Sequence, residues 1–436
     1  MKRRLAALLG LVIISVWFTS FALGEDTWKY GLDLRLRQEY LINVLDVNDE
    51  TGKDDSYLRF KVSPWVKFTP SDNFDIMLKL TAEPKYFFLS GDYGKGNLWT
   101  AEEMVFDNLY FDYKNAFGAP IDLRIGRQDF LGAYGDGFVI MDGTPGDGSR
   151  TFYFNAFKGT WKINPKNSVD LIYINDFRQD HMPVINEQYV TTNTSDEQGI
   201  VLYGKSKIGD DFLIEPYYIW KREGFYGSTK TLKLNTIGGR AVFSPDPWKI
   251  KGELAGQFGD YNDSDVDRSG IGGYLNASYK FKEVCMTPEV MAGYYYLSGD
   301  DPNTNKNEAW DPLFSRWPWL SELYVFTLAK ESKIVAYWSN MQVYRASVKF
   351  DITKNTNLQL WYNYLRANEN PNIAGSIFSN DGKTRGSLPQ IQLNHKFNKN
   401  LDGYILVEEL FPGSYYVDGS DKTWFIRWQL QYKFSS

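Results

Sequence analysis

The stretch IRWQLQYKF, residues 426–434, alternates between bulky apolar and polar side chains without a break. A period of two places alternate side chains on opposite faces of a β-strand. In a membrane barrel one such face meets lipid and the other meets the lumen. The stretch therefore predicts one strand of a transmembrane β-barrel. Its apolar face carries Ile426, Trp428, Leu430, Tyr432 and Phe434, and its polar face carries Arg427, Gln429, Gln431 and Lys433.

The segment WKYGLDLRLR, residues 28–37, shows the same alternation near the other end of the sequence. A soluble β-sandwich also alternates, but it rarely combines so many charges on one face with so many aromatic rings on the other. The final strand ends in an aromatic residue, Phe434, which resembles the assembly signal of outer-membrane barrels, and the two serines that follow it depart from that signal. This ending implies the barrel assembly machinery as a partner.

Between these two segments the same period indicates further strands, separated by short turns and long loops in alternation. With the terminal strands they make eighteen, although sixteen is also compatible with the pattern. We expect an all-β, antiparallel, up-and-down barrel with periplasmic termini and long extracellular loops, because closure removes every unpaired backbone edge in lipid. The further strands are expected near 56–68, 73–83, 103–114, 121–129, 151–162, 167–177, 197–207, 211–222, 231–244, 248–259, 269–282, 286–298, 340–351, 356–366, 386–397 and 400–410.

The longest loop, 299–339, holds Trp310, Trp317 and Trp319. It is long enough to fold over or into the mouth of the barrel. The other long loops are expected at 42–55, 84–102, 130–150, 178–196, 223–230, 260–268 and 367–385.

Residues 1–24 have the pattern of a cleaved signal peptide, with basic residues ahead of an apolar run and small residues before position 25. The apolar run from Leu5 to Phe18 is shorter than the ~20 residues of a membrane-spanning helix, which disfavours a retained anchor. We expect residues 25–436 to form a single barrel domain in the outer membrane of a Gram-negative bacterium, in contact with lipid and lipopolysaccharide.

The composition excludes several classes of function. Aromatic residues reach 17% while the mean hydropathy is −0.42, a combination expected of barrel strands. Cys285 is the only cysteine, so neither an intrachain disulfide nor a cysteine-based zinc site can form. Loss of residues 1–24 would take the net charge from −6 to −9, which disfavours nucleic acid as a partner. We expect no catalytic site, no metal and no cofactor.

Two regions resemble the alginate export porin family. The first is RIGRQDFLGAYGDGFVIMDGTPGDGSRTFYFNAFKGTW, residues 124–161, and the second combines YYYLSGD at 294–300 with EELFPG at 408–413 and the final strand through Phe434. The resemblance implies an eighteen-stranded monomeric barrel whose arginine-rich lumen exports an anionic polysaccharide such as alginate. A periplasmic export partner is compatible with that role.

The phase of the strands places many basic residues on the inward face. Arginine suits the recognition of an anionic solute because its planar fork donates two parallel hydrogen bonds to a carboxylate and stays charged. Several weak sites of this kind would let an anion move along a pore by passive diffusion. In the alternative interpretation the same charges form ion pairs that hold the wall. The predicted pore-lining residues are Arg35, Arg37, Arg59, Arg124, Arg127, Arg240, Arg345, Arg427, Lys61 and Lys251, with Arg127 at a slip in the alternation.

Two other functions remain open from the sequence. A structural or adhesive barrel would have its lumen occluded by the 299–339 loop. A lipase or deacylase active at the rim would need a histidine on the lipid-facing side, and His395 is the only candidate.

Overall fold

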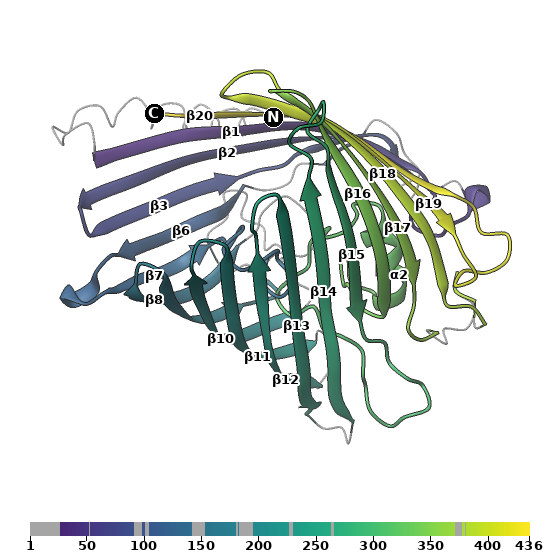
Figure 1. The fold of residues 1–436 in the computed structure, drawn as a ribbon, viewed down its shortest axis with the longest axis horizontal. Helices are drawn as coiled ribbons and strands as arrows, with labels where there is room; N and C mark the ends of the chain where they lie inside the picture. The colour runs from purple at the N-terminus through teal and green to yellow at the C-terminus, as the bar shows by residue number, and fades with distance from the viewer. Residues whose placement is uncertain are drawn as a thin grey trace.

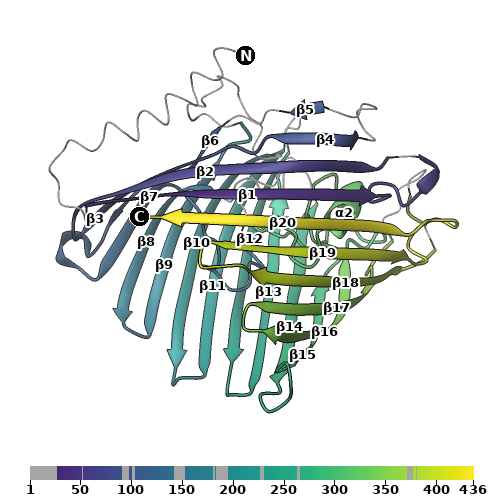
Figure 2. The ribbon, with the colours of Figure 1, turned by 90° about the horizontal axis from the view of Figure 1, so that it is seen from above.

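A computed structural model describes residues 27–51, 53–90, 98–100, 104–141, 153–179, 182, 195–225, 230–262, 266–370, 377–379 and 381–436, so the expected signal peptide lies outside the described residues. These residues form a closed antiparallel barrel of eighteen strands (Figures 1 and 2), which confirms the predicted fold class and excludes sixteen. The wall consists of β1 (Trp28–Ile42), β2 (Asp55–Ser71), β3 (Phe74–Thr81), β6 (Val105–Tyr113), β7 (Ile121–Gln128), β8 (Phe154–Asn164), β9 (Asn167–Asp176), β10 (Ser195–Ile208), β11 (Phe212–Phe225), β12 (Thr231–Phe243), β13 (Trp248–Tyr261), β14 (Asp267–Lys280), β15 (Glu289–Leu297), β16 (Met341–Thr353), β17 (Thr356–Arg366), β18 (Thr384–Lys396), β19 (Leu401–Pro412) and β20 (Thr423–Ser435).

The barrel closes between its first and last strands. β1 pairs with β20 from Gly31 opposite Ser435 to Ile42 opposite Trp424. The start of β1 and the end of β20 therefore lie at the same end of the barrel, together with short connections such as 209–211 and 354–355. We call this the turn end, which faces the periplasm in an outer-membrane barrel, and the opposite end the loop end.

Two strands occur where the sequence predicted only a loop at 84–102. β4 (Lys85–Ser90) pairs with the loop-end half of β2, and β5 (Leu98–Thr100) pairs with β4. β3 ends at Thr81, and Ala82 still bridges to Val62 of β2 before β4 resumes pairing along the same edge. The alternation of apolar and polar side chains is interrupted at Glu83, which is buried. Because of this interruption the alternation did not predict β4.

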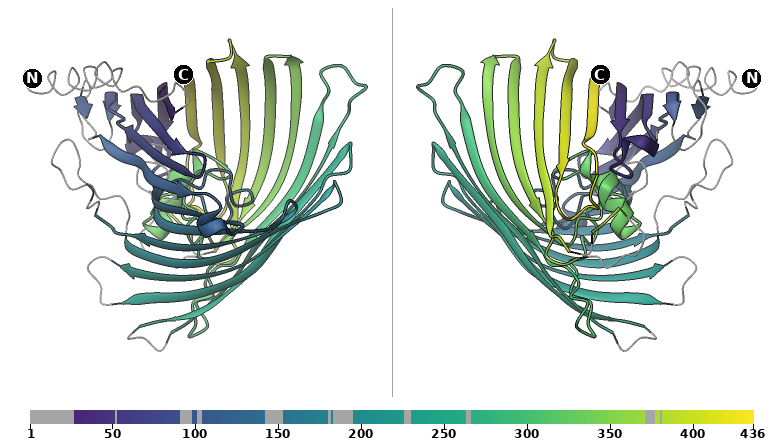
Figure 3. Two further views of the ribbon diagram at one scale, coloured as in Figure 1. Left: turned by 90° about the vertical axis from the view of Figure 1, so that its left-hand side faces the viewer. Right: turned by 90° about the vertical axis from the view of Figure 1, so that its right-hand side faces the viewer.

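Two loop segments lie inside the barrel (Figure 3): residues 129–141 and residues 310–338, which we call the inserted segment. The inserted segment contains α2 (Tyr324–Ser332), the one α-helix among the described residues, and the short 3-10 helices η3 (Asp49–Thr51) and η4 (Ala116–Gly118) lie in connections. Phe314 bridges to Ile140, which joins the two segments. The sequence did not predict α2.

Glycines in the wall make room for the inserted segment. The ring of Phe314 lies against Gly199, where a Cβ atom would approach it to 2.5 Å, and the ring of Trp310 lies against Gly272, where a Cβ atom would approach it to 2.6 Å. Both rings are 1% exposed. The apolar core therefore sits within the barrel, between the wall and the loop segments, whereas the outer face exposes apolar residues such as Leu254 and Leu275.

No α-helix in the described ranges is long and apolar enough to cross a membrane.

Candidate solute site in the lumen

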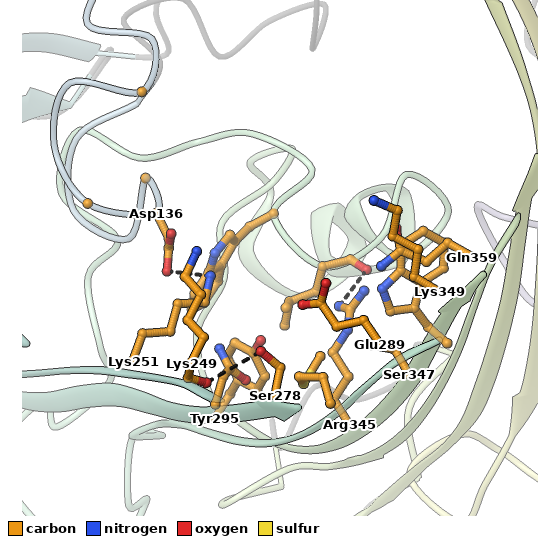
Figure 4. Close-up of a pocket in the computed structure, with 18 of the residues that line it drawn as sticks. Asp136, Lys249, Lys251, Ser278, Glu289, Tyr295, Arg345, Ser347, Lys349 and Gln359 are labelled. Atoms are coloured by element: carbon orange, nitrogen blue, oxygen red, sulfur yellow. Dashed lines mark hydrogen bonds and ion pairs between the residues drawn. The ribbon is translucent and has the colours of Figure 1, made fainter. Parts of the chain in front are cut away.

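A pocket of about 520 Å³ lies inside the barrel, between β13 to β17 on one side and the inserted segment with residues 129–141 on the other. Figure 4 shows basic side chains on both of its sides, with Lys249 and Lys251 facing Arg345 and Lys349. The lining residues are Gly132, Gly135, Asp136, Gly137, Met141, Lys249, Lys251, Asn276, Ser278, Glu289, Met291, Tyr295, Trp317, Trp319, Leu320, Arg345, Ser347, Lys349, Gln359 and Trp361.

Arg345, on β16, is the most distinctive member of the pocket. Its Nη1 donates to the backbone carbonyl of Leu320 at 3.3 Å and its Nη2 donates to Oε1 of Gln390 at 3.4 Å. Its guanidinium also lies 5.5 Å from the ring centroid of Trp361. Among the described residues no carboxylate is within ion-pair distance of it. Two long hydrogen bonds to neutral acceptors leave most of its five N–H donors available to a ligand.

On the opposite side of the pocket Lys251 is held by a carboxylate. Its Nζ lies 2.8 Å from Asp136, which also pairs with Arg240 at 3.3 Å and accepts a hydrogen bond from the Tyr274 hydroxyl at 2.8 Å. Burial by itself would raise the pKa of the Asp136 carboxyl, but Lys251 and Arg240 hold that pKa below its usual range. Asp136 therefore stays ionised and offsets part of the positive charge of the pocket.

Two further lysines lie toward the turn end. Lys249 makes no ion pair with any described residue, and Lys349 lies 3.6 Å from the half-exposed Asp351. Glu289 is the only lining acid besides Asp136. Four basic side chains thus face two acidic ones, so the pocket favours an anion.

Aromatic rings supply the apolar part of the lining. Trp317 and Trp319 come from the inserted segment, whereas Tyr295 and Trp361 come from β15 and β17. Trp317 is fixed by a hydrogen bond of 2.9 Å from its Nε1 to the carbonyl of Gly137, and Trp319 packs on Tyr295 with ring centroids 5.2 Å apart. Fixed flat rings next to cationic side chains suit a ligand with a carboxylate and an apolar ring face, as in an acidic sugar.

Four of the predicted pore-lining arginines lie together at the seam of β1, β2 and β20. Arg37, Arg59 and Arg427 all approach Glu39, with Nε of Arg427 at 2.7 Å. Arg59 also pairs with Glu83 at 2.7 Å, and Nη2 of Arg35 pairs with the same carboxylate. Each of these arginines has a carboxylate partner, which matches the ion-pair interpretation of their role. Contact with a solute stays a prediction for them.

The remaining predicted residues are also placed by neighbouring side chains. Arg124 pairs with Asp112 at 2.6 Å and Arg240 pairs with Glu215 at 2.5 Å. Arg127, 3% exposed, donates to Asn155 at 2.9 Å and lies over the ring of Tyr153. Lys61 is a half-buried residue of β2. Of the ten predicted residues, Arg345 and Lys251 line the pocket. A third, Arg240, pairs with Asp136, which is also a lining residue.

Several members of the pocket were not among the predicted site residues. Trp361 lies two residues after Gln359 on β17, so both side chains point to the same face of the strand. The alternation could therefore have placed Trp361 on the inward face. Asp136 and Trp317 come from loops, where no period exists to show their direction. Their role depends on the loops entering the barrel, which the sequence did not determine.

A buried charge cluster attaches the inserted segment to the wall. Nζ of Lys221 lies 2.6 Å from Glu223, 3.2 Å from Glu197 and 3.3 Å from Asp311, and all four side chains are at most 4% exposed. Arg316 of the inserted segment pairs with both Glu197 and Glu223. Charges removed from water in this way are stable only as a set, because each would be costly without its partners.

The contacts of His395 do not indicate a catalytic site for a lipase or deacylase at the rim. His395 on β18 shares a hydrogen bond of 2.8 Å with the Thr356 hydroxyl and packs edge-on against Phe397. Both partners are ordinary neighbours at a strand end. Within the described ranges, no group of three or more His, Cys, Asp or Glu side chains could hold a metal ion.

Comparison with known proteins gives one family and a set of barrels. The family model described as "Alginate export" matches residues 27–428. None of the curated protein sequences is significantly similar to this chain. Similar solved structures include Pseudomonas aeruginosa OccK2 (OpdF) in complex with glucuronate, with 10% identity, a TM-score of 0.56 and coverage of 94% of this chain and 98% of that chain.

Two further solved structures are similar to this chain. Pseudomonas aeruginosa OccK9 (OpdG) has 9% identity and a TM-score of 0.59, with coverage of 94% of this chain and 99% of that chain. Acinetobacter baumannii OccAB4 has 10% identity and a TM-score of 0.58, with coverage of 94% and 98%. At these identities the likeness concerns the barrel fold alone.

Proposed function

This chain belongs to the alginate export family, and we propose that it is an outer-membrane porin that conducts acidic saccharides or other organic anions past a pocket centred on Arg345. The observation that carries the proposal is that no carboxylate of the described residues pairs with the Arg345 guanidinium, whereas Arg59 and Arg427 in the same lumen each pair with one. The carboxylate of a solute would take the place of the missing partner. In this proposal the solute crosses the barrel by passive diffusion, and no chemical step takes part.

The ligand class follows from the lining. A carboxylate can accept two parallel hydrogen bonds from Arg345, while Lys249 and Lys349 add long-range attraction. The rings of Trp317 and Trp361 offer flat surfaces for the C–H face of a pyranose. OccK2, which shares the barrel fold, was crystallised with glucuronate, so glucuronate is a suitable probe.

We predict that replacing Arg345 by glutamine weakens the block of the pore by glucuronate. In planar-bilayer recordings of the refolded chain we expect anion-selective current that glucuronate, and an acidic polysaccharide such as alginate, reduce when added at the turn end. Loss of a charge-assisted hydrogen-bonded contact should raise the half-blocking concentration by about tenfold or more. A cation-selective wild-type pore, or equal block in both proteins, would contradict the proposal.

The matched control is Lys162→Gln. Lys162 lies at the turn end of β8 and pairs with Asp122 at 2.8 Å, outside the pocket. The substitution removes one positive charge from the same end of the barrel, so it tests whether overall charge rather than the pocket causes block. Block should stay within about twofold of wild type, as expected for a screened distant charge.

We predict the opposite change for Asp136→Asn. This substitution removes the carboxylate that offsets Lys251 while an amide keeps the size of the side chain. The pocket gains one net positive charge, so glucuronate should block the pore at a severalfold lower concentration. Titration of the block measures this, and an unchanged or higher half-blocking concentration would show that Lys251 does not face the solute.

A structural barrel with an occluded lumen is the second candidate, and one observation favours it. The inserted segment and residues 129–141 carry buried apolar side chains into the lumen. Measurable conductance of the unmodified chain separates the two functions. A chain that inserts into bilayers but passes no current would favour the structural role.

A further inference from the structure

A second pocket, of about 410 Å³, lies at the loop end between the wall and the inserted segment. Its lining comes from the loop ends of β11, β13 and β14, from the loop at 300–309, from α2 with the residues that follow it, and from Asn370 after β17. Arg268 and Ser278, which line this pocket and the first one respectively, are ten residues apart on β14. At ~3.3 Å per residue they lie about 33 Å apart, so the two pockets are separate.

Arg268 is the unusual residue in this pocket. It is 4% exposed, and the only hydrogen bond of its guanidinium to a described residue runs from Nη1 to the side-chain oxygen of Asn307. That oxygen also accepts from the backbone N–H of Ala309 at 3.2 Å. The Nε of Arg268 is buried and has no hydrogen-bond partner. No carboxylate among the described residues lies within ion-pair distance.

Such a guanidinium is costly in isolation. A buried charge is normally paired, and removal of its counter-charge is strongly unfavourable. Arginine carries five N–H donors in a fixed fork, of which Arg268 uses one. The free donors therefore fit an oxyanion from outside the chain.

The acids near Arg268 do not supply this partner, and Asp311, whose charge acts on Arg268, is itself paired with Lys221 at 3.3 Å. Glu331 is taken by Arg385 at 2.8 Å and by the side-chain amide of Asn340 at 3.0 Å. Asp300 is exposed, and its carboxylate accepts from the backbone N–H of Glu308 at 3.1 Å. Both line the pocket, so a ligand must present its carboxylate to Arg268 and keep it away from these two side chains.

We propose that this pocket is a second anion site, at the loop end, which binds a small organic carboxylate through Arg268. The rings of Phe225, Tyr261 and Tyr337 in its lining offer an apolar surface for the rest of the ligand. The volume suits a single sugar acid rather than a polymer. The site does not depend on the Arg345 pocket, although a porin with an anion site at each end would hold its solute on both sides of the inserted segment.

Calorimetric titration of the refolded chain in detergent with sodium glucuronate tests the proposal, with glucose as the neutral comparison. We expect two binding events in the wild type, loss of one in Arg268→Gln and loss of the other in Arg345→Gln. Arg268→Lys keeps the charge without the fork and should bind about tenfold more weakly. Lys306→Gln, an exposed residue of the same loop, should bind as the wild type does.

The outcomes separate the two sites. If Arg268→Gln, with wild-type circular dichroism and conductance, leaves the titration unchanged, the second site is wrong even when Arg345→Gln removes binding. If Arg268→Gln removes the only binding event, the second site stands and the Arg345 pocket fails. Equal heats with glucose and glucuronate would overturn the role of a carboxylate at both sites.

Discussion

Replacing Arg316 by methionine should raise the single-channel conductance severalfold. Arg316 is 1% exposed and pairs with Glu197 and Glu223 on the wall, so its charge holds the inserted segment in the lumen. Removing one partner from a buried ionic cluster costs about 3–5 kcal/mol, because the remaining charges lose their counter-charge. The backbone ladder of the wall does not depend on this contact, so the barrel should stay closed while the inserted segment is released.

Planar-bilayer recording measures the effect, and Lys333→Met is the control because Lys333 lies exposed on the same segment. Its conductance should equal that of the wild type. An Arg316→Met pore with unchanged conductance and unchanged thermal transition would show that the buried charge cluster does not fix the segment.

Replacing Glu39 by alanine should strongly destabilise the barrel at its closing seam. Glu39 is 1% exposed and faces Arg37, Arg59 and Arg427 where β1 meets its neighbours β2 and β20. Its loss takes a shared counter-charge from three arginines at the seam, although Arg59 keeps its pair with Glu83 and Arg427 keeps its pair with Glu322. We expect a loss of about 3–5 kcal/mol in the free energy of unfolding.

Urea unfolding followed by tryptophan fluorescence measures this loss. Glu50→Ala, an exposed acid in the nearby connection after β1, should change the free energy by less than about 0.5 kcal/mol. A Glu39→Ala protein as stable as the wild type would mean that the seam is held by its backbone hydrogen bonds alone.

The alternation of side chains was sufficient to predict the wall. All eighteen strands occur within a few residues of their expected positions, because each strand must present one face to lipid and the other to the interior. The same requirement does not apply in loops. β4 and α2 carry no such period, so they were missed.

The partners of the arginines could not be predicted in the same way. The phase of a strand gives the direction of a side chain but not what it meets. Arg427 pairs with Glu322 and Arg240 with Asp136, and both acids come from loop segments that enter the barrel. Arg427 and Arg240 also pair with Glu39 and Glu215 on other strands, so the absence of a carboxylate near Arg345 among the described residues depends on contacts between strands as well as on loop placement. No feature of the sequence around Arg345 distinguishes it.

The length of the longest loop did carry a signal. The loop at 299–339, which holds Trp310, Trp317 and Trp319, was long enough to fold over or into the mouth, and the structure places the inserted segment inside. Where it would attach was not predictable, because the wall glycines against which its rings pack, Gly199 and Gly272, look like any other glycines of a strand.

The most direct test of the central claim is a crystal structure of the protein soaked with glucuronate at a concentration that blocks the pore. We predict electron density for the sugar in the Arg345 pocket, with its carboxylate on the guanidinium of Arg345 and its ring against Trp317 or Trp361. Density elsewhere in the lumen with an empty Arg345 pocket would contradict the account.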